Sequence, residues 1–408
     1  EVEDEQLWDG QARSSRYQDF SKSGFVTPPE FDSEQAAAYQ AAAGKLLDGY
    51  NKIHVRMCDY LAEQLPRPES MKPDAYQRNL KARAFDVARY LLCFGIPTGV
   101  GQVTSIRTLE RQVRRLKASE YAEVRELAGE IAAACAAPPS VPWNSSRTFE
   151  ATAQTEAAPT EAVAPTLARH VAVNEHLLRS REDLQQWARE NLPESDEGFS
   201  EAVDLLKPVD TLSDIVATLL YPVTHRSYRA LYEMARAWSG AQKNEVIEVA
   251  LRSRTARDEL LRNFRCAPYV YDIVMDIGAY RDLHRHRRCQ QFRQSYSRRL
   301  GFETPDAIEA AGLSNSYHLL MSHASNLAGS LPDLGSHYLL PFATRSRFLF
   351  KMDFAETEYI SRLRSGVKGH FSYRRIAWQM KEKMLALEPE LGRLMEATPP
   401  WVDDPLQR

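Results

Sequence analysis

An arginine-rich segment, residues 281–299, has a composition suited to binding anions. It contains seven arginines, two histidines and one acid, Asp282, although the whole chain carries a net charge of −3. At its centre an Arg-His-Arg triplet, residues 285–287, is followed by seven residues and then by Ser295. Guanidinium groups bind phosphate oxygens through two aligned hydrogen bonds, so the cluster indicates an anion site. The competing interpretation is a solvated basic face whose arginines pair with acids such as Asp282 or Asp276.

The elements around this segment should place its arginines together. Residues 269–275 are aromatic and β-branched and follow Pro268, which predicts a strand, and we expect a helix from about 278 to 296. Basic groups packed on one helix face repel one another, so a bound polyanion would relieve that repulsion. The residues that recur at helical spacing and would share this face are Arg285, Arg288, Phe292 and Ser295.

A second charged region, residues 353–366, is explained by helix structure alone. Asp353 and Glu356 have the spacing of a capping box at the start of a helix. Arg364 lies in the last turn, where the helix dipole favours cations, and Gly366 fits the helix end. A role for Arg364 in a site would therefore need support from elsewhere.

Other kinds of site are not indicated by the sequence. The ten histidines show no paired metal-ligand spacing, so we assign no metal, and the five cysteines form no CxxC pair. Gly95, Gly99 and Gly101 lack the spacing of a phosphate-binding loop. No GxSxG nucleophile elbow is present, although a Ser-His-Asp hydrolase stays open. Ser14 and Arg16 belong to a short polar segment that predicts a loop.

Length and composition are those of a globular protein of two to three domains. The chain has 408 residues, of which 43% are hydrophobic and 26% are charged. No apolar run approaches the roughly 20 residues that a membrane span needs. With scattered cysteines and no signal peptide, we expect a cytoplasmic protein without a membrane partner. The near-neutral charge argues against general nucleic-acid binding, which depends on clustered Lys and Arg.

Composition divides the chain into two lobes. Residues 136–166 are rich in Ala, Pro and Thr, and we interpret them as a linker between a first lobe, 1–135, and a second lobe, 167–408. Helical patterns dominate both lobes and strand signals are few, so we predict an α+β fold rich in helix. The helical patterns cover 34–64, 104–135, 168–191 and 210–253, and further short strands are expected at 338–342 and 347–351.

A weak internal repeat relates the two lobes at an offset of 248 residues. Residues 89–94, RYLLCF, align with residues 337–342, HYLLPF. Without any gap, Ser105 then meets Asp353, and in each copy a helix that ends in arginine follows. This agreement favours a tandem duplication.

The Arg-His-Arg triplet with its later serine resembles the signature of the flavin-dependent thymidylate synthases, also called thymidylate synthase complementing proteins. In that family an aromatic-rich strand precedes the signature, and an Arg-x-x-Leu-Pro element and a helix ending in Leu-Arg follow it. Residues 269–274, 338–341 and 363–364 resemble that succession. The resemblance covers roughly residues 14–130 and 260–380.

The first lobe resembles a second, incomplete copy of the same family. Ser14-x-Arg16 is similar to the end of the signature, and Arg89 with its following leucines is similar to the Arg-x-x-Leu element. We expect the missing start of this copy to lie before Glu1. The resemblance therefore implies a divergent tandem duplication in which each lobe contains a sheet with long packed helices.

Membership would imply a reductive methylation of a pyrimidine nucleotide at C5. The family binds FAD and deoxyuridylate (dUMP), takes a methylene group from methylenetetrahydrofolate and a hydride from the reduced flavin, and regenerates the flavin with NADPH. Its sites are assembled across the subunits of a tetramer. Two-lobed chains would therefore form a homo-oligomer, a dimer that imitates this tetramer.

The resemblance also implies which residues form the site. Arg364 would lie beside the pyrimidine, where a guanidinium stabilises negative charge on the ring, and Ser295 would contact the nucleotide phosphate; both are catalytic candidates. The nucleotide would also contact Arg285, Arg16, Ser14, Arg89 and His337. The flavin would contact Arg285, His286, Arg287 and Asp353.

Several positions depart from the family pattern. Residues 290–293 replace its Ser-x-Asn-Glu centre, Asp353 replaces a helix asparagine, and His337 replaces an arginine that the first lobe keeps as Arg89. One interpretation is that each lobe retains part of one composite site. Another is a catalytically altered or inactive member that binds nucleotide or flavin, or serves as a scaffold. A helical RNA-binding protein ranks last, because no aromatic stacking platform accompanies the arginines.

Overall fold

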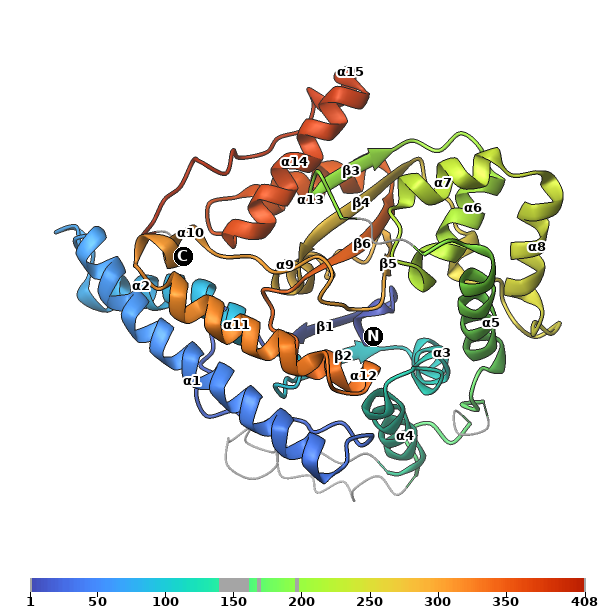
Figure 1. Cartoon of the computed structure of the whole chain (residues 1–408), viewed down its shortest axis with the longest axis horizontal. Coiled ribbons are helices and arrows are strands. Elements are labelled where there is room, and N and C mark those ends of the chain that lie inside the picture. The colour runs from blue at the N-terminus through green and yellow to red at the C-terminus, as the bar shows by residue number, and fades with distance from the viewer. Residues whose placement is uncertain (1, 139–160, 167–169, 195–197, 407–408) are drawn as a thin grey trace, which may run out of the picture. The chain divides into compact units, whose positions relative to one another are not determined.

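The computed structural model describes residues 2–138, 161–166, 170–194 and 198–406 (Figure 1). Contacts within the chain define two compact units, a smaller one of residues 1–11 and 101–179 and a larger one of residues 12–100 and 180–408. These units divide the chain at other points than the predicted lobes 1–135 and 167–408, and the lobes stay a prediction. Most of the predicted linker, residues 136–166, lies outside the described residues.

The smaller unit combines a pair of strands with a helical hairpin. Strands β1 (Trp8–Ala12) and β2 (Val100–Thr104) form a two-stranded sheet that reaches the border of the unit. The predicted helix over 104–135 is interrupted, because residues 118–121 separate α3 (Ile106–Lys117) from α4 (Ala122–Ala136). A small apolar cluster fixes the hairpin; its buried members are Val113, Leu116, Ala128, Cys135, Ala164 and Val171. The unit also contains η1 (Val2–Asp4) and the start of α5 (Glu175–Asn191).

Long helices build the first part of the larger unit. Helix α1 (Ser33–Gln64) begins at a capping box in which Asp32 and Gln35 bond each other's backbone N–H groups. It packs along α2 (Pro73–Ala88) and along α11 (Ser314–Ala328), although almost 250 residues separate α1 from α11 in the sequence (Figure 1). The short helix η2 (Arg89–Leu91) follows α2 directly.

A four-stranded antiparallel sheet forms the centre of the larger unit. Its strand order is β3-β4-β6-β5, and Tyr269 of β4 lies opposite Met352 of β6. Alternate side chains of β4 and β6 point to one face and form an apolar core under α13 and α14. The strands are β3 (Val203–Leu206), β4 (Tyr269–Asp276), β5 (Gln290–Arg293) and β6 (Arg345–Met352).

The opposite face of the sheet carries buried ion pairs. Lys351 Nζ lies 2.7 Å from Asp214 Oδ1 of α6, and it also donates to Thr218 Oγ1 at 3.0 Å. Arg347 Nη1 lies 3.2 Å from Asp272 Oδ2. Because a buried charge is costly unless it is paired, these contacts fix how α6 packs on the sheet.

The remaining helices surround the sheet and the α1–α2 pair. The predicted helical stretch over 210–253 consists of three helices and a short turn, because Pro222 and residues 224–227 interrupt it. The further elements are α6 (Thr211–Leu220), η4 (Tyr221–Val223), α7 (Tyr228–Ala237), α8 (Gly240–Leu251), η5 (Arg262–Phe264), α9 (Ile277–Leu283), α10 (Asp306–Ala310), α12 (Asp333–Ser336), η6 (His337–Leu339), α13 (Phe354–Ser365), α14 (Phe371–Leu387) and α15 (Pro389–Gly392).

The two segments of the predicted repeat meet in a reciprocal backbone contact. The N–H of Phe94 donates to the carbonyl of Leu340 at 3.2 Å, and the N–H of Phe342 donates to the carbonyl of Leu92 at 2.8 Å. Residues 89–91 and 337–339 are both short 3-10 helices. Both hydrogen bonds join positions related by the same offset, so the contact has local twofold character.

The predicted fold class, α+β and rich in helix, is confirmed. The strands expected over 269–275 and 347–351 are β4 and part of β6. The strand expected at 338–342 is wrong, because His337–Leu339 form a 3-10 helix and only Pro341 makes an isolated bridge, to Cys93. Proline lacks the N–H that a strand ladder needs.

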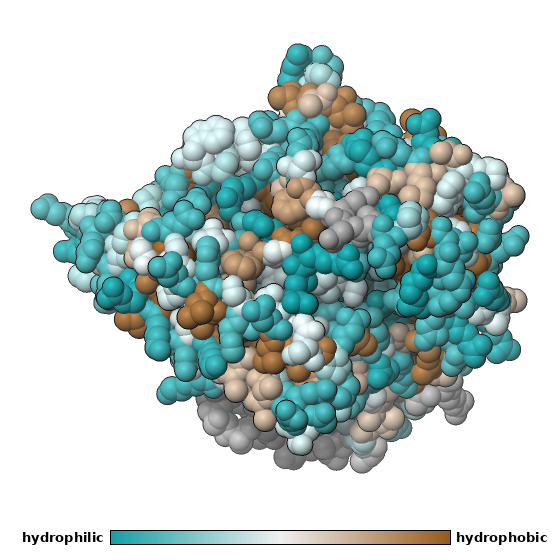
Figure 2. Space-filling model, viewed as in Figure 1, coloured by the Kyte–Doolittle hydropathy of each residue, from teal (hydrophilic) through white to brown (hydrophobic). Residues whose placement is uncertain are grey.

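Figure 2 shows a face on which hydrophilic side chains predominate and hydrophobic ones are scattered among them. No helix in the described part of the chain is long and apolar enough to cross a membrane.

Candidate functional site

The arginine-rich segment folds differently from the predicted helix over 278–296. Helix α9 ends at Leu283, and residues 290–293 form β5, which pairs with β6. Between them the carbonyl of His286 accepts hydrogen bonds from Gln291 Nε2 at 2.7 Å and from Cys289 Sγ at 3.0 Å. Residues 290–293, which the helical spacing predicts to be helical, thus form a strand along the edge of β6. Arg285, Arg288, Phe292 and Ser295 therefore do not share a helix face.

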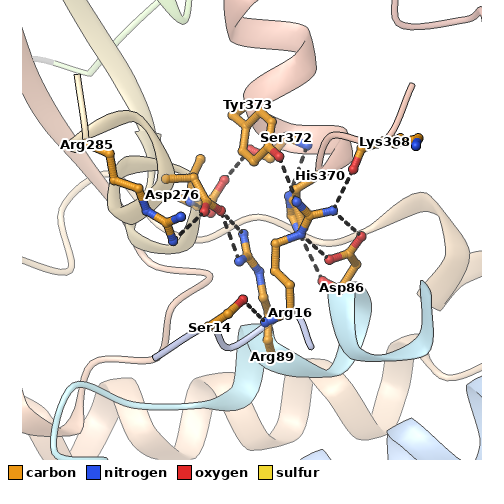
Figure 3. A network of polar contacts seen from close by, with 12 residues as sticks. Ser14, Arg16, Asp86, Arg89, Asp276, Arg285, Lys368, His370, Ser372 and Tyr373 are labelled. Atoms are coloured by element: carbon orange, nitrogen blue, oxygen red, sulfur yellow. Dashed lines mark hydrogen bonds and ion pairs between the residues drawn. The ribbon is translucent and has the colours of Figure 1, made fainter. Parts of the chain in front are cut away.

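Arg16 is held by three acceptors in the buried part of the larger unit (Figure 3). Its Nε and Nη2 donate to the two oxygens of Asp86 at 2.7 and 3.1 Å, and its Nη1 donates to Tyr373 Oη at 2.8 Å. Nη2 also donates to the carbonyl of Lys368. Burial opposes the charge of Arg16, but Asp86 raises its pKa, so the guanidinium stays charged. The hydroxyl of Ser14 accepts from the backbone N–H of Arg16 at 3.3 Å.

Asp282 is the carboxylate around which further arginines gather. Nη1 and Nη2 of Arg89 lie 3.2 and 3.3 Å from Asp282 Oδ2, and Arg285 Nη2 lies 3.2 Å from Oδ1. Burial alone would raise the pKa of Asp282, but Arg89, Arg16, Arg285 and Arg364 together hold it below its usual value. Asp282 is therefore ionised at neutral pH and lies in the field of all four arginines.

Arg364 is tied to the triplet through a histidine. Its Nε donates to His286 Nε2 at 2.7 Å, and His286 Nδ1 lies 3.4 Å from Glu356 Oε1. Both His286 and Glu356 are buried, at 5% exposure. Burial lowers the pKa of His286 despite the nearby Glu356, so the imidazole is neutral at pH 7.

A buried aspartate with polar partners lies in the same region. Asp276 accepts from the backbone N–H of Ala279 at 2.7 Å and from the hydroxyl of Ser372. Burial raises the pKa of Asp276. At Gly278 a Cβ atom would lie 3.5 Å from Nη2 of Arg89, which brings the start of α9 close to that arginine.

Charge is unbalanced around Asp282. Arg89, Arg285 and Arg364 are three cations near one carboxylate, whereas Arg16 already has Asp86 as its own partner. Glu356 is separated from Arg364 by the imidazole of His286. The cluster therefore retains positive charge that a small dianion would neutralise.

The structure brings together most of the predicted nucleotide contacts. Arg16 and Arg89, from the first part of the chain, lie near Arg285, from the second (Figure 3). Arg364, also from the second part, acts together with these three arginines on the charge of Asp282. Ser14 joins this group only through the backbone of Arg16. Arginines from both halves of the chain thus lie close together, and the composite nucleotide site stays a prediction.

Other predicted residues have different surroundings. His337 is buried at 3% exposure and faces the ring of Tyr296, the neighbour of the half-buried Ser295. Asp353 caps α13, because its Oδ1 accepts from the N–H of Glu356 at 2.9 Å. Arg287 is half-buried next to His286. His337 thus lies against Tyr296, and Asp353 lies at the start of α13.

Sequence reasoning missed three of the four residues that hold the arginine cluster. Asp86 and Tyr373 bind Arg16, and Glu356 was interpreted only as part of a helix cap. Asp282 carried a signal, since it is the single acid in the arginine-rich segment and was named as a pairing partner. For the other three, pairing depends on contacts between distant segments that spacing does not reveal. Among the described residues no group of His, Cys, Asp or Glu is arranged to hold a metal.

Part of the chain matches a known protein family. Residues 214–390 match the model of the thymidylate synthase complementing proteins, Thy1, which confirms the resemblance for this part of the chain. This segment is therefore similar to that family, and it contains Asp282, Arg285, His286 and Arg364.

Longer similarity links the chain to proteins named UPF0159. One from Chlamydia muridarum is 26% identical over 350 residues, which cover 84% of this chain and 63% of the relative. One from Chlamydia pneumoniae is 24% identical over 351 residues, or 84% and 62%. One from Thermoplasma acidophilum is 26% identical over 213 residues, or 50% and 42%. The chain thus spans less than two thirds of the length of these relatives.

Proposed function

We propose that this protein is a thymidylate synthase-like enzyme whose arginine cluster binds the phosphate of a pyrimidine nucleotide such as dUMP. The observation that carries the proposal is the gathering of Arg89, Arg285 and Arg364 around the single carboxylate of Asp282. A phosphate monoester carries a charge of about −1.5 to −2 at pH 7, which suits this excess of cations. The reaction proposed is reductive methylation of the nucleotide at C5.

The geometry of Arg364 supports a role beside the reacting ring. Its Nε is used by His286, but neither terminal nitrogen donates a hydrogen bond within the described part of the chain. Its guanidinium lies 5.8 Å from the centre of the Tyr373 ring. A guanidinium with both terminal nitrogens open can stabilise negative charge that develops on a pyrimidine. We therefore assign Arg364 to the ring, and Arg89 and Arg285 to the phosphate.

The side chains that the resemblance assigned to flavin fit that role poorly. Both ring nitrogens of His286 face protein groups, and Asp353 caps α13 and would bring a negative charge toward the flavin phosphates. Arg285 and Arg287 are the assigned residues that suit an anionic cofactor. We therefore propose residue roles toward the nucleotide only. FAD, when bound, would supply the hydride for the methylation.

A second candidate is a nucleotide-binding member that no longer methylates. The contacts of His286 and Asp353 favour it, as does the pairing of Arg16 with Asp86, which occupies a predicted nucleotide contact. Such a protein would bind dUMP through the same arginines. It would differ from the enzyme in taking up no FAD.

The experiment starts from calorimetry of dUMP and of deoxyuridine with the purified full-length protein. We expect dUMP to bind and deoxyuridine, which lacks the phosphate, to bind at least about tenfold more weakly, because charged hydrogen bonds contribute about 1.5–3 kcal/mol each. If dUMP does not bind, both candidates are wrong.

Added FAD and NADPH then separate the two candidates. The enzyme should acquire the absorbance of bound oxidised flavin and should oxidise NADPH in a reaction that requires dUMP and methylenetetrahydrofolate. A protein that binds dUMP but remains colourless with added FAD would support the second candidate.

A further inference from the structure

We propose that Glu356 and His286 are positioning residues that hold the guanidinium of Arg364 in place for its ligand. The inference rests on the proposed role of Arg364 toward the nucleotide, and it gives His286 a task different from the flavin contact that the resemblance implied. The geometry is a chain of three side chains, in which Glu356 contacts His286 Nδ1 and His286 Nε2 contacts Arg364 Nε.

The contacts of the chain determine which nitrogen of His286 carries the proton. An arginine Nε–H group only donates hydrogen bonds, so His286 Nε2, at 2.7 Å from it, must be the nitrogen with the free lone pair. The proton of the neutral ring is then on Nδ1, which points to Glu356 Oε1 at 3.4 Å. Each group thus has the partner that its chemistry requires, and the imidazole has one allowed tautomer.

Both outer members of the chain lie on one helix. Glu356 is in the first turn of α13, where its backbone N–H is bound by the cap residue Asp353, and Arg364 is in the last turn. Eight residues of helix place them about 12 Å apart along the axis. The imidazole of His286 lies between the two side chains, so the rigid helix and the buried ring together restrict the guanidinium.

The anchoring uses only part of the guanidinium. Because the bond to His286 takes the Nε–H, the two terminal nitrogens of Arg364 stay available, and neither donates to the described part of the chain. Fixing a long side chain in advance removes rotamer entropy that ligand binding would otherwise cost. This is the arrangement expected of a pre-organised cation.

Protonation of His286 would break the chain. A doubly protonated ring places an N–H against the N–H of Arg364, and the two cations repel each other. The groups that face His286 are Glu356, Arg364 and the ring of Tyr359 from α13, and Arg285 on its own segment. Burial and both arginines disfavour the proton and Glu356 favours it, and the net effect lowers the pKa of His286. The chain is therefore intact at neutral pH and opens on acidification.

Variants of His286 test this chain through the affinity for dUMP, measured by calorimetry at pH 7.5 and 5.5. His286→Gln keeps an acceptor near the position of Nε2, so its affinity at pH 7.5 should stay within about threefold of the wild type. His286→Ala should lose about tenfold or more, the value of one charged hydrogen bond. The exposed His318, bound to Thr304, provides the control His318→Gln, which should bind like the wild type.

The pH profile distinguishes positioning from a general structural role. The second ionisation of the phosphate, with a pKa of about 6, weakens binding at pH 5.5 in every variant alike. The wild type should lose more affinity than His286→Gln between the two pH values, because only the wild type has an imidazole to protonate. Glu356 favours the protonated imidazole, so Glu356→Gln should lower the pKa of His286 further. The additional loss of dUMP affinity on acidification should then occur at lower pH in this variant. The proposal is overturned if His286→Ala binds dUMP as well as the wild type at pH 7.5, or if His286→Gln and wild type respond equally to acid.

A readout without nucleotide separates this proposal from the proposed function. Nitrogen-15 NMR of the histidine rings, with the His286 signal assigned from its loss in His286→Gln, should show the proton on Nδ1. If that tautomer is found but the wild type binds no dUMP, the proposed function fails and the chain of contacts stands. If the proton is on Nε2, the chain is wrong even when dUMP binds.

Discussion

Both terminal nitrogens of Arg89 lie on one oxygen of Asp282, at 3.2 and 3.3 Å, although 193 residues separate the two in the sequence. Arg89 opens the short helix after α2, and Asp282 lies in α9 just before the Arg-His-Arg triplet. The side chains of both are almost fully buried. This ion pair joins early and late segments of the larger unit and places a distant arginine beside the triplet.

Removing the carboxylate of Asp282 should destabilise the fold and should make binding of an external anion more favourable. Asp282→Asn leaves Arg89 and Arg285 without their counter-charge, and breaking a buried ion pair costs about 3–5 kcal/mol. The free energy of unfolding, measured in urea, should fall by about that amount. Added phosphate should restore more stability to the variant than to the wild type, because an anion can replace the carboxylate.

The exposed Asp48 offers the matched control for this change. Asp48→Asn should alter the free energy of unfolding by less than about 0.5 kcal/mol. Equal stability of Asp282→Asn and wild type would mean that the ion pair contributes nothing to the fold.

The contribution of Asp282 should depend on pH in one direction. Its pKa in the folded state is lowered, because four arginines outweigh the effect of burial. Its stabilising effect is therefore complete above the unfolded pKa of 3.8 and is lost as the pH falls through the lower folded value. In urea titrations from pH 7 to 2.5, the stability difference between wild type and Asp282→Asn should shrink only below about pH 4. A constant difference across this range would contradict the lowered pKa.

Arg16 should not tolerate replacement by lysine. Its planar group meets both oxygens of Asp86 and the hydroxyl of Tyr373 at once, which an ammonium cannot do. We expect Arg16→Lys to lower the free energy of unfolding by about 2–3 kcal/mol and Tyr373→Phe by about 1 kcal/mol. Denaturation of Arg78→Lys, at an exposed arginine, should match that of the wild type. A cost for Arg16→Lys no larger than for Arg78→Lys would count against the network.

The sequence was a good guide where local pattern determines structure. The aromatic and β-branched composition of residues 269–275 predicts β4, and the charges and glycine around 353–366 predict both ends of α13. Even the repeat can be traced in the structure, since Ser105 and Asp353 both cap helices and residues 94 and 342 make equivalent backbone bonds. These features depend either on residues that are close in the sequence or on the similarity between the two copies of the repeat.

The arginine-rich segment shows where local pattern fails. Its spacing is helical up to Ser295, but pairing with β6 draws residues 290–293 into the sheet. Strand β5 forms its backbone hydrogen bonds with β6, and this pairing with a distant segment cannot be read from the sequence of the arginine-rich segment itself. Likewise, Arg16 in the segment before α1 pairs with Asp86 of α2, a contact between segments that are distant in the sequence. Sequence motifs could therefore identify the candidate site residues, but they could not predict which ion pairs these residues form.

The buried pair of Lys351 and Asp214 should behave as a coupled unit. Lys351→Met alone leaves Asp214 charged and without its cation, at a cost of about 3–5 kcal/mol. Asp214→Asn keeps acceptors for Tyr228 and Thr218 while it removes the charge. The double variant should therefore be more stable than the sum of the single losses predicts, by about 1–3 kcal/mol. Additive losses in a urea double-mutant cycle would show that the two charges act independently.

Binding of dUMP should distinguish the arginines of the cluster from their neighbour in sequence. Arg285→Ala and Arg364→Ala each remove a charged hydrogen bond, worth about 1.5–3 kcal/mol, so the dissociation constant should rise about tenfold to hundredfold. Arg288→Ala is the matched control, since a helix through this segment would place Arg288 beside Arg285, whereas in the structure Arg288 is exposed and outside the group of arginines that acts on Asp282. We expect it to bind dUMP within about twofold of the wild type, as surface changes usually cost little. A loss at Arg288 equal to that at Arg285 would favour the continuous helix and place the phosphate elsewhere.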